Sequence, residues 1–306
     1  MEIFMKTALP PLPPHYESFA EALVGLFGNS VSITQTDRLS GGDINKAYGI
    51  TLNTGHHVFM KANSKQNVSF FKAEAAGLSA IEKTHAIETP KILCTGTDNG
   101  EDVGYSFLLL EFIKSAKPKK DYWETFARDL AAMHSADVDD KYGFFADNFI
   151  GATEQINTPK ERWIDFFREN RLEYQFKKAD SYFSASDRTK ITKLLDSLEK
   201  FLVEPASPSL LHGDLWSGNV MCGADGKAML IDPACYIGHA EADIAMTELF
   251  GGFPENFYSA YKEVRPLEPG YEERRDLYNL YHLLNHLNLF GPTYLTPVLS
   301  IIEEYN

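Results

Sequence analysis

The sequence has few cysteines, no excess of basic residues and no long apolar run. Each of these absences excludes certain classes of protein. Three cysteines occur in 306 residues without a Cys-x-x-Cys pair, so neither a disulfide framework nor a zinc site is predicted. This favours a reducing, cytoplasmic setting. No uncharged apolar stretch approaches the roughly 18–20 residues that span a bilayer, and the proline-rich start does not resemble a signal peptide. We therefore expect a soluble protein.

The charge balance also limits the partners. The formal net charge is −14, from 43 acidic and 29 basic residues, so no general field attracts nucleic acid or anionic lipid, and neither is an expected partner. An acidic surface favours a cationic substrate, although most acidic proteins of this size are merely soluble. With 44% hydrophobic residues, the chain can bury one large core or two modest ones, and we expect two lobes.

The first part of the chain has the pattern of an antiparallel sheet with one helix. After a possible first helix at 16–28, residues 31–62 alternate and turn like a meander of three strands. Three segments continue the order: "SFFKAEAAGLSAIEKT" is predicted as a helix, and "TPKILCTG" and "YSFLLLEFI" as strands. Residues 1–113 are interpreted as an N-terminal lobe.

The remainder is predicted to be mainly helical. The stretch 114–120 is polar and contains a proline, so it is interpreted as the boundary between the lobes. Apolar residues then recur at spacings of three and four, as in "DYWETFARDLAAMHSA" and "YEERRDLYNLYHLLNHLNLFG". The predicted class is α+β, with a C-terminal lobe at 114–306.

Three oxygen-bearing side chains lie at the ends of short apolar strands in the second lobe. Asp214 and Asn219 are five residues apart in "LLHGDLWSGNV", and Asp232 follows the strand "AMLI". Such side chains suit a hard cation such as Mg²⁺, which is usually shared with substrate phosphates. Each also has a structural interpretation, as a turn cap, a loop support or an Asp-Pro turn. Their order and spacing together favour the metal site.

This order resembles the catalytic loop and metal-binding aspartate of the protein-kinase-like fold. Gly213 stands where protein kinases have arginine, a variant typical of small-molecule kinases such as aminoglycoside phosphotransferases and choline kinases. The first lobe offers the remaining parts in the expected order: Gly41 and Gly42 in a loop that could approach phosphate, Lys61 at the end of "HVFMK", and Glu74 thirteen residues later to pair with it.

A narrower resemblance covers nearly the whole chain. "HGDLWSGN" followed by "DPACYIGHAEADIAMTELFGGF" is similar to the signature of the fructosamine and ketosamine kinase family, and "NFIGATEQINT" and "LYHLLNHLNLFG" extend the similarity. The resemblance implies a protein-kinase-like, two-lobed fold with nucleotide bound by the N-terminal lobe. It also implies a kinase that uses ATP and Mg²⁺ to phosphorylate the 3-hydroxyl of ketoamines, either small molecules or glycated lysines of proteins, and thereby reverses glycation.

The same resemblance implies roles for individual residues. Asp214 would be the base that accepts the sugar hydroxyl proton, Asn219 and Asp232 would bind the metal, and Lys61, held by Glu74, would orient the α and β phosphates. The segment from Glu111 to Ile113 would form the hinge whose main chain holds the adenine.

Several further residues keep two interpretations. Trp216 could offer a flat apolar face to the sugar or pack under the catalytic loop. Glu241 and Asp243 could stabilise the charge of the substrate amine, while Asp243 could equally cap a helix. His239 is open between site and structure, as are Arg168 and Arg171, for which surface solvation or helix-to-helix pairing is the more common role. For His282 and His286, four residues apart on a helix, packing is favoured over metal binding.

Two rival functions remain. One is an aminoglycoside or choline-like phosphotransferase of the same fold. The other is a pseudokinase that acts as a binding module, against which the complete set of kinase residues argues.

Overall fold

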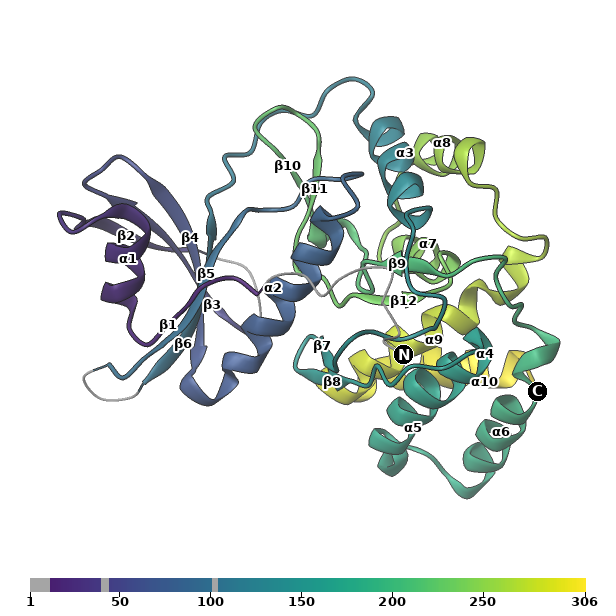
Figure 1. Cartoon of the computed structure of the whole chain (residues 1–306). Helices are drawn as coiled ribbons and strands as arrows, with labels where there is room; N and C mark the ends of the chain where they lie inside the picture. The colour runs from purple at the N-terminus through teal and green to yellow at the C-terminus, as the bar shows by residue number, and fades with distance from the viewer. Residues whose placement is uncertain (1–11, 40–43, 101–103) are drawn as a thin grey trace, which may run out of the picture. The chain divides into compact units, whose positions relative to one another are not determined.

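A computed structural model describes residues 12–39, 44–100 and 104–306 (Figure 1). These form two compact units, which we call the sheet unit (12–122 with 220–232) and the helical unit (123–219 with 233–306). By their contacts, residues 114–122 group with the sheet unit, so this boundary lies after the predicted lobe boundary at residue 113. The assignment of nucleotide binding to residues 1–113 stays a prediction. In the described part of the chain, no helix is long and apolar enough to cross a membrane.

The sheet unit is built on six strands in the order β1-β5-β6-β4-β3-β2. Its elements are β1 (His15–Tyr16), α1 (Phe19–Phe27), β2 (Ile33–Leu39), β3 (Lys46–Leu52), β4 (His57–Ser64), α2 (Val68–Glu82), β5 (Ile92–Asp98) and β6 (Tyr105–Glu111), with a separate hairpin of β10 (Val220–Cys222) and β11 (Ala228–Leu230). The predicted meander, the helix after it and the two later strands are confirmed.

One detail of this unit differs from the predicted antiparallel sheet: β1 pairs with β5 in parallel. The possible first helix at 16–28 is confirmed as α1, so the unit has a helix in addition to α2. β1 has two residues, too few for an alternating pattern to reveal it. Its approach to β5 depends on Gly96, since a Cβ there would lie 2.7 Å from Tyr16 O.

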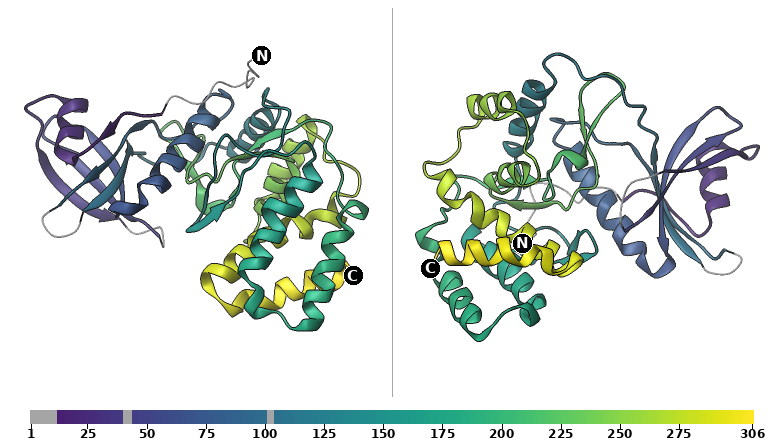
Figure 2. Two further views of the ribbon diagram at one scale, coloured as in Figure 1. Left: turned by 60° about the horizontal axis from the view of Figure 1, so that its bottom comes forward. Right: turned by 180° about the vertical axis from the view of Figure 1, so that it is seen from behind.

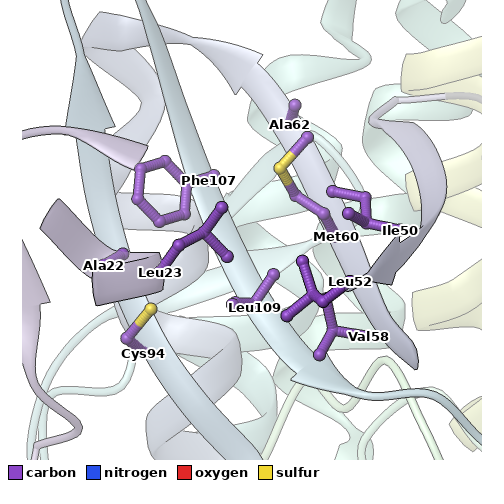
Figure 3. Close-up of a cluster of buried hydrophobic side chains, with 10 residues drawn as sticks. All are labelled: Ala22, Leu23, Ile50, Leu52, Val58, Met60, Ala62, Cys94, Phe107 and Leu109. Atoms are coloured by element: carbon purple, nitrogen blue, oxygen red, sulfur yellow. The ribbon is translucent and has the colours of Figure 1, made fainter. Parts of the chain in front are cut away.

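The two faces of the sheet carry different helices. Alternate side chains of a strand point to opposite faces. One face packs against α1 (Figure 3), through Ala22, Leu23, Ile50, Leu52, Val58, Met60, Ala62, Cys94, Phe107 and Leu109. The other packs against α2, through Phe71, Ala75, Leu78, Leu108 and Leu110. Lys61, which lies between Met60 and Ala62 on β4, therefore faces α2.

The helical unit contains most of the helices, and its long helix α9 packs against α5, α7 and α10 (Figure 2). Its helices are α3 (Tyr122–His134), α4 (Trp163–Phe166), α5 (Tyr174–Lys178), α6 (Ala185–Asp196), α7 (Glu241–Leu249), α8 (Glu255–Val264), α9 (Tyr271–Phe290) and α10 (Leu295–Glu304). A π-helical segment, Phe167–Glu173, joins α4 to α5. Two short antiparallel pairs complete it: β7 (Asn148–Ile150) with β8 (Thr153–Gln155), and β9 (Ser209–Leu211) with β12 (Tyr236–Gly238).

Candidate active site

Lys61 is the centre of a charged cluster in the sheet unit. Its cross-strand partner Leu108 packs against α2, and the same face brings Lys61 Nζ to 2.8 Å from Glu74 Oε1 on that helix. The ammonium also contacts Asp232 Oδ1, at the end of the β10–β11 hairpin. Lys61 is 8% exposed. The predicted pairing of Lys61 with Glu74 is thus present, and Asp232 shares the same ammonium.

One ammonium facing two carboxylates leaves this cluster with surplus negative charge. Burial by itself would lower the pKa of Lys61, but the charges of Glu74 and Asp232 outweigh it and raise that pKa. The pKa of Glu74 is raised to about 7 by burial, with a further contribution from Asp232 that opposes the lowering effect of Lys61. An additional cation near Asp232 would relieve this charge.

Asp232 combines an accessible carboxylate with an unusual backbone. Its side chain is 43% exposed, and its φ of 53° is uncommon for a residue other than glycine. Such a conformation costs on the order of 1–3 kcal/mol and is found mainly where the surrounding structure requires it, often at functional sites. The carboxylate of Asp232 therefore contacts Lys61 through one oxygen and keeps an exposed surface.

In the helical unit, Asp214 and Asn219 are hydrogen-bonded to each other. They lie on the loop after β9, where a 3-10 turn, Ser217–Asn219, folds the chain back. Asn219 Nδ2 donates to the carbonyl of Asp214 at 2.8 Å and to its Oδ2 at 3.2 Å. Within the described residues no donor contacts Asn219 Oδ1, so the amide keeps an oxygen for a hard cation.

The carboxylate of Asp243 fixes the backbone of this loop. Its Oδ2 accepts the His212 N–H at 2.7 Å, and its Oδ1 accepts the Gly213 N–H at 2.9 Å. Burial would raise the pKa of Asp243, but the hydrogen bond and charge of His134 lower it, so the carboxylate stays ionised. Asp243 is 1% exposed, and this contact explains its burial better than a helix cap or a substrate amine.

Glycine suits position 213 because of both its backbone conformation and its surroundings. Its φ is 81°, and a Cβ would lie 2.1 Å from the carbonyl oxygen of Ala234. The Ala234 N–H in turn donates to the carbonyl of His212 at 2.9 Å. The loop and the segment after Asp232 and Pro233 are therefore in main-chain contact, which leaves no room for the arginine found in protein kinases.

We expect Gly213→Ala to lower kcat by about 100-fold, because the new Cβ must displace the loop that carries Asp214. Gly291→Ala is the matched control: Gly291 has a φ of 88°, but an added Cβ would meet nothing within 4 Å. That control should lose roughly 1–2 kcal/mol of stability at unchanged kcat. Steady-state kinetics and thermal unfolding check both, and equal kcat values in the two variants would contradict the steric argument.

Trp216 is held by its own loop and remains partly open. Its ring lies over Gly218, where a Cβ would approach the ring to 2.3 Å, and its edge contacts Phe250 at a centroid distance of 6.5 Å. The residue is nevertheless 38% exposed. Packing of Trp216 on the loop that carries Asp214 is thus observed, and part of its apolar surface is exposed.

Glu241 and His239 are buried and their polar atoms contact protein groups. Arg274 donates to both Glu241 oxygens at 2.6 Å, and the Glu268 N–H donates to Oε1 at 2.9 Å. His239 Nδ1 lies 2.8 Å from the hydroxyl of Tyr278, and burial lowers its pKa to about 3. These contacts give both side chains structural roles, and their predicted contact with substrate stays without support from the geometry.

The remaining predicted residues lie outside the described ranges, at the expected hinge, or within the helical unit. Gly41 and Gly42 lie outside the described residues. At the expected hinge, Glu111 ends β6 and its Oε1 accepts the Lys91 N–H at 3.1 Å, while Ile113 follows the strand. Arg171 is fully buried, and His286 Nδ1 bonds to the carbonyl of His282. No cluster of three or more His, Cys, Asp or Glu residues that could hold a metal is present in the described ranges.

The sequence interpretation missed a set of buried amides. Asn148, Gln155 and Asn157 are 1–4% exposed and contact one another and the carbonyls of Ala234 and Cys235. The signal that could have found them is the density of amides in "NFIGATEQIN", where a short strand pair should carry apolar residues inward.

Comparison with known proteins places this geometry in a family. The fructosamine kinase family model matches residues 15–306. A probable ketoamine kinase of Synechocystis sp. is 39% identical over 297 residues, covering 95% of this chain and 97% of that protein. A chloroplastic protein-ribulosamine 3-kinase of Oryza sativa subsp. indica is 42% identical over 282 residues, covering 91% and 80%.

Solved structures agree. A Haemophilus somnus 129PT protein assigned as a fructosamine-3-kinase is 35% identical with a TM-score of 0.84, and the match covers 94% of this chain and 96% of that chain. Choline kinase from Streptococcus pneumoniae has a TM-score of 0.58 at 14% identity, over 93% and 96% of the two chains, which shows a shared fold alone. The predicted protein-kinase-like fold is thereby confirmed, and the chain belongs to the fructosamine kinase family.

Proposed function

We propose that this protein is an ATP- and Mg²⁺-dependent ketosamine 3-kinase that phosphorylates the 3-hydroxyl of ribulosamine- or fructosamine-type adducts. The observation that carries the proposal is the shared ion pairing of Lys61 with Glu74 and Asp232 in a member of the fructosamine kinase family. A lysine held by a helix carboxylate, together with an accessible aspartate, is part of the arrangement that kinases of the protein-kinase-like fold use for phosphoryl transfer.

Asp214 is the proposed base. The Asn219 amide donates to its Oδ2, which orients the carboxylate, and Asp243 holds the loop backbone on either side of Gly213. A carboxylate fixed in this way can accept the proton of a sugar hydroxyl as that oxygen attacks. Catalysis then rests on position and on charge stabilisation more than on covalent chemistry.

The residues present fit a magnesium ion. Oxygen donors of the kind Mg²⁺ prefers are present in each unit, Asn219 Oδ1 in the helical unit and the exposed Asp232 carboxylate in the sheet unit, where the charge surplus around Lys61 favours a cation. When bound, the ion would neutralise charge on the phosphates. Lys61 would contact the α and β phosphates while Glu74 keeps its side chain in place, and the segment from Glu111 to Ile113 would meet the adenine.

The proposed acceptor is a ketoamine, either a small molecule or a glycated lysine of a protein, whose phosphorylation leads to deglycation. The rice relative is named a protein-ribulosamine 3-kinase, which makes ribulosamines the first substrates to test. Trp216, two residues after Asp214, supplies a partly exposed aromatic face suited to the carbons of a sugar. The aminoglycoside and choline phosphotransferases remain an alternative on the strength of the fold alone.

A substrate panel tests the proposal. The purified protein is incubated with MgATP and, separately, ribulosyl-lysine, fructosyl-lysine, glycated lysozyme, kanamycin and choline. We expect phosphorylation of the ketoamines, with NMR placing the phosphate on the 3-oxygen. Robust phosphorylation of kanamycin or choline without any ketoamine product would replace the proposal with the alternative, and nucleotide binding without transfer to any acceptor would favour a pseudokinase.

A further inference from the structure

The buried amides of the β7–β8 hairpin contact the segment that follows Asp232 and Pro233. Asn148 and Gln155 are cross-strand partners, so their side chains share one face of the hairpin. Asn148 Nδ2 donates to the carbonyl of Cys235 at 2.7 Å, and Gln155 Nε2 donates to the carbonyl of Ala234 at 2.9 Å. The hairpin thus holds two successive carbonyls of this segment.

The amide of Gln155 is itself fixed in one orientation. Its Nε2 also donates to Asn148 Oδ1 at 2.7 Å, and its Oε1 accepts the hydroxyl of Tyr281 at 2.6 Å. Both amide hydrogens and the oxygen are therefore used, in a side chain that is 1% exposed. A buried polar network with every member satisfied favours a single conformation over alternatives.

The Ala234 carbonyl that Gln155 holds is the atom against which Gly213 packs. The Cα of Gly213 approaches this oxygen so closely that an added Cβ would lie 2.1 Å from it. On the other side of the same peptide segment, the Ala234 N–H bonds to the carbonyl of His212. Any shift of Ala234 is therefore passed to the two residues that precede Asp214.

We propose that Gln155 is a positioning residue for the catalytic base, acting through the Ala234 carbonyl on the backbone of the catalytic loop. Asp243 fixes the N–H groups of His212 and Gly213 from one side, and Gln155 fixes the opposing carbonyl of Ala234. The role in catalysis rests on the proposed function, whereas the mechanical link between Gln155 and the loop does not depend on it.

Gln155→Met and Gln175→Met form a matched pair for the test. Both glutamines are fully buried; Gln175 bonds to Asn285 and Asn288 on α9 and also interacts with the Tyr281 hydroxyl, whereas Gln155 donates to the carbonyl of Ala234. Each change removes a buried amide at similar volume, so both should cost comparable stability. We expect kcat for a ketoamine to fall about 10- to 100-fold in Gln155→Met alone, with KM changed little.

Hydrogen exchange of the nucleotide-free protein gives a readout independent of activity. Amides in 210–219 and at Ala234 should exchange about tenfold faster in Gln155→Met than in wild type or Gln175→Met. If Gln155→Met does not fold, Tyr281→Phe removes the hydroxyl that orients Gln155 and should show the same change more weakly.

The outcomes separate the two proposals. Equal exchange in 210–219 for wild type, Gln155→Met and Tyr281→Phe would overturn the positioning role, whatever the enzyme phosphorylates. A fall in kcat that merely follows the loss of melting temperature in both glutamine variants would also overturn it. Absence of ketoamine phosphorylation by the wild type, with faster exchange in Gln155→Met, would refute the proposed function and leave the mechanical link standing.

Discussion

Asp214→Asn is expected to lower kcat by about 10²–10⁴-fold while nucleotide binding stays near the wild-type value, because the change removes a base but keeps the shape of the side chain. The asparagine Oδ1 can still accept the hydrogen bond from Asn219 Nδ2, so the loop should keep its conformation. Single-turnover assays with a ketoamine measure the chemical step, and calorimetry measures the affinity for MgATP.

Asp180→Asn serves as the control for this experiment. Asp180 pairs with Arg188 on the surface of the helical unit and is far from the loop in sequence. Its substitution should leave kcat within about twofold, since a surface ion pair contributes little. Turnover by Asp214→Asn at close to the wild-type rate would remove Asp214 from the role of base.

Lys61→Met is expected to lower kcat/KM for ATP by about 10²–10³-fold, because the phosphates of the nucleotide lose their fixed positive partner. The change also leaves Glu74 and Asp232 facing each other without a cation, so we expect a loss of stability of about 3–5 kcal/mol. Glu74→Gln should have a smaller effect, since Lys61 keeps its contact with Asp232. Kinetics at saturating ketoamine and urea unfolding measure the two effects.

Lys65→Met is the matched control, because Lys65 follows β4 on the surface and its ammonium donates to Asn99 Oδ1 at 2.6 Å. Both its activity and its stability should remain near wild type. If Glu74→Gln proved as damaging as Lys61→Met, the contact with Asp232 would be insufficient to hold the lysine, and the shared pairing would not explain its position.

The sequence was most informative where the chemistry is local. Asp214 and Asn219 lie on one short loop, so their spacing alone predicts that their side chains can meet, and the structure bonds them directly. Lys61 and Glu74 are predicted nearly as well, because a strand and the helix after it place them on facing surfaces. The alternation of β4 and the helical period of α2 determine this orientation.

Partners distant in the chain were not predictable in the same way. Asp243 lies 30 residues after Gly213, and Gln155 lies 79 residues before Ala234. A hydrophobicity pattern indicates that a segment is buried, but it does not predict which buried donor will form a hydrogen bond with which acceptor. The same limit applies to β1, whose pairing with β5 joins residues 80 positions apart through two residues.

The contact between Gly213 and the Ala234 carbonyl has a consequence for regulation. Many protein kinases order an activation loop by pairing a phosphorylated residue with arginine. An arginine at position 213 would require the segment around Ala234 to shift, because its Cβ would lie 2.1 Å from the carbonyl oxygen of Ala234. The arginine used for such control is thus replaced by a glycine, and the backbone of the loop at His212 and Gly213 is held by the buried carboxylate of Asp243.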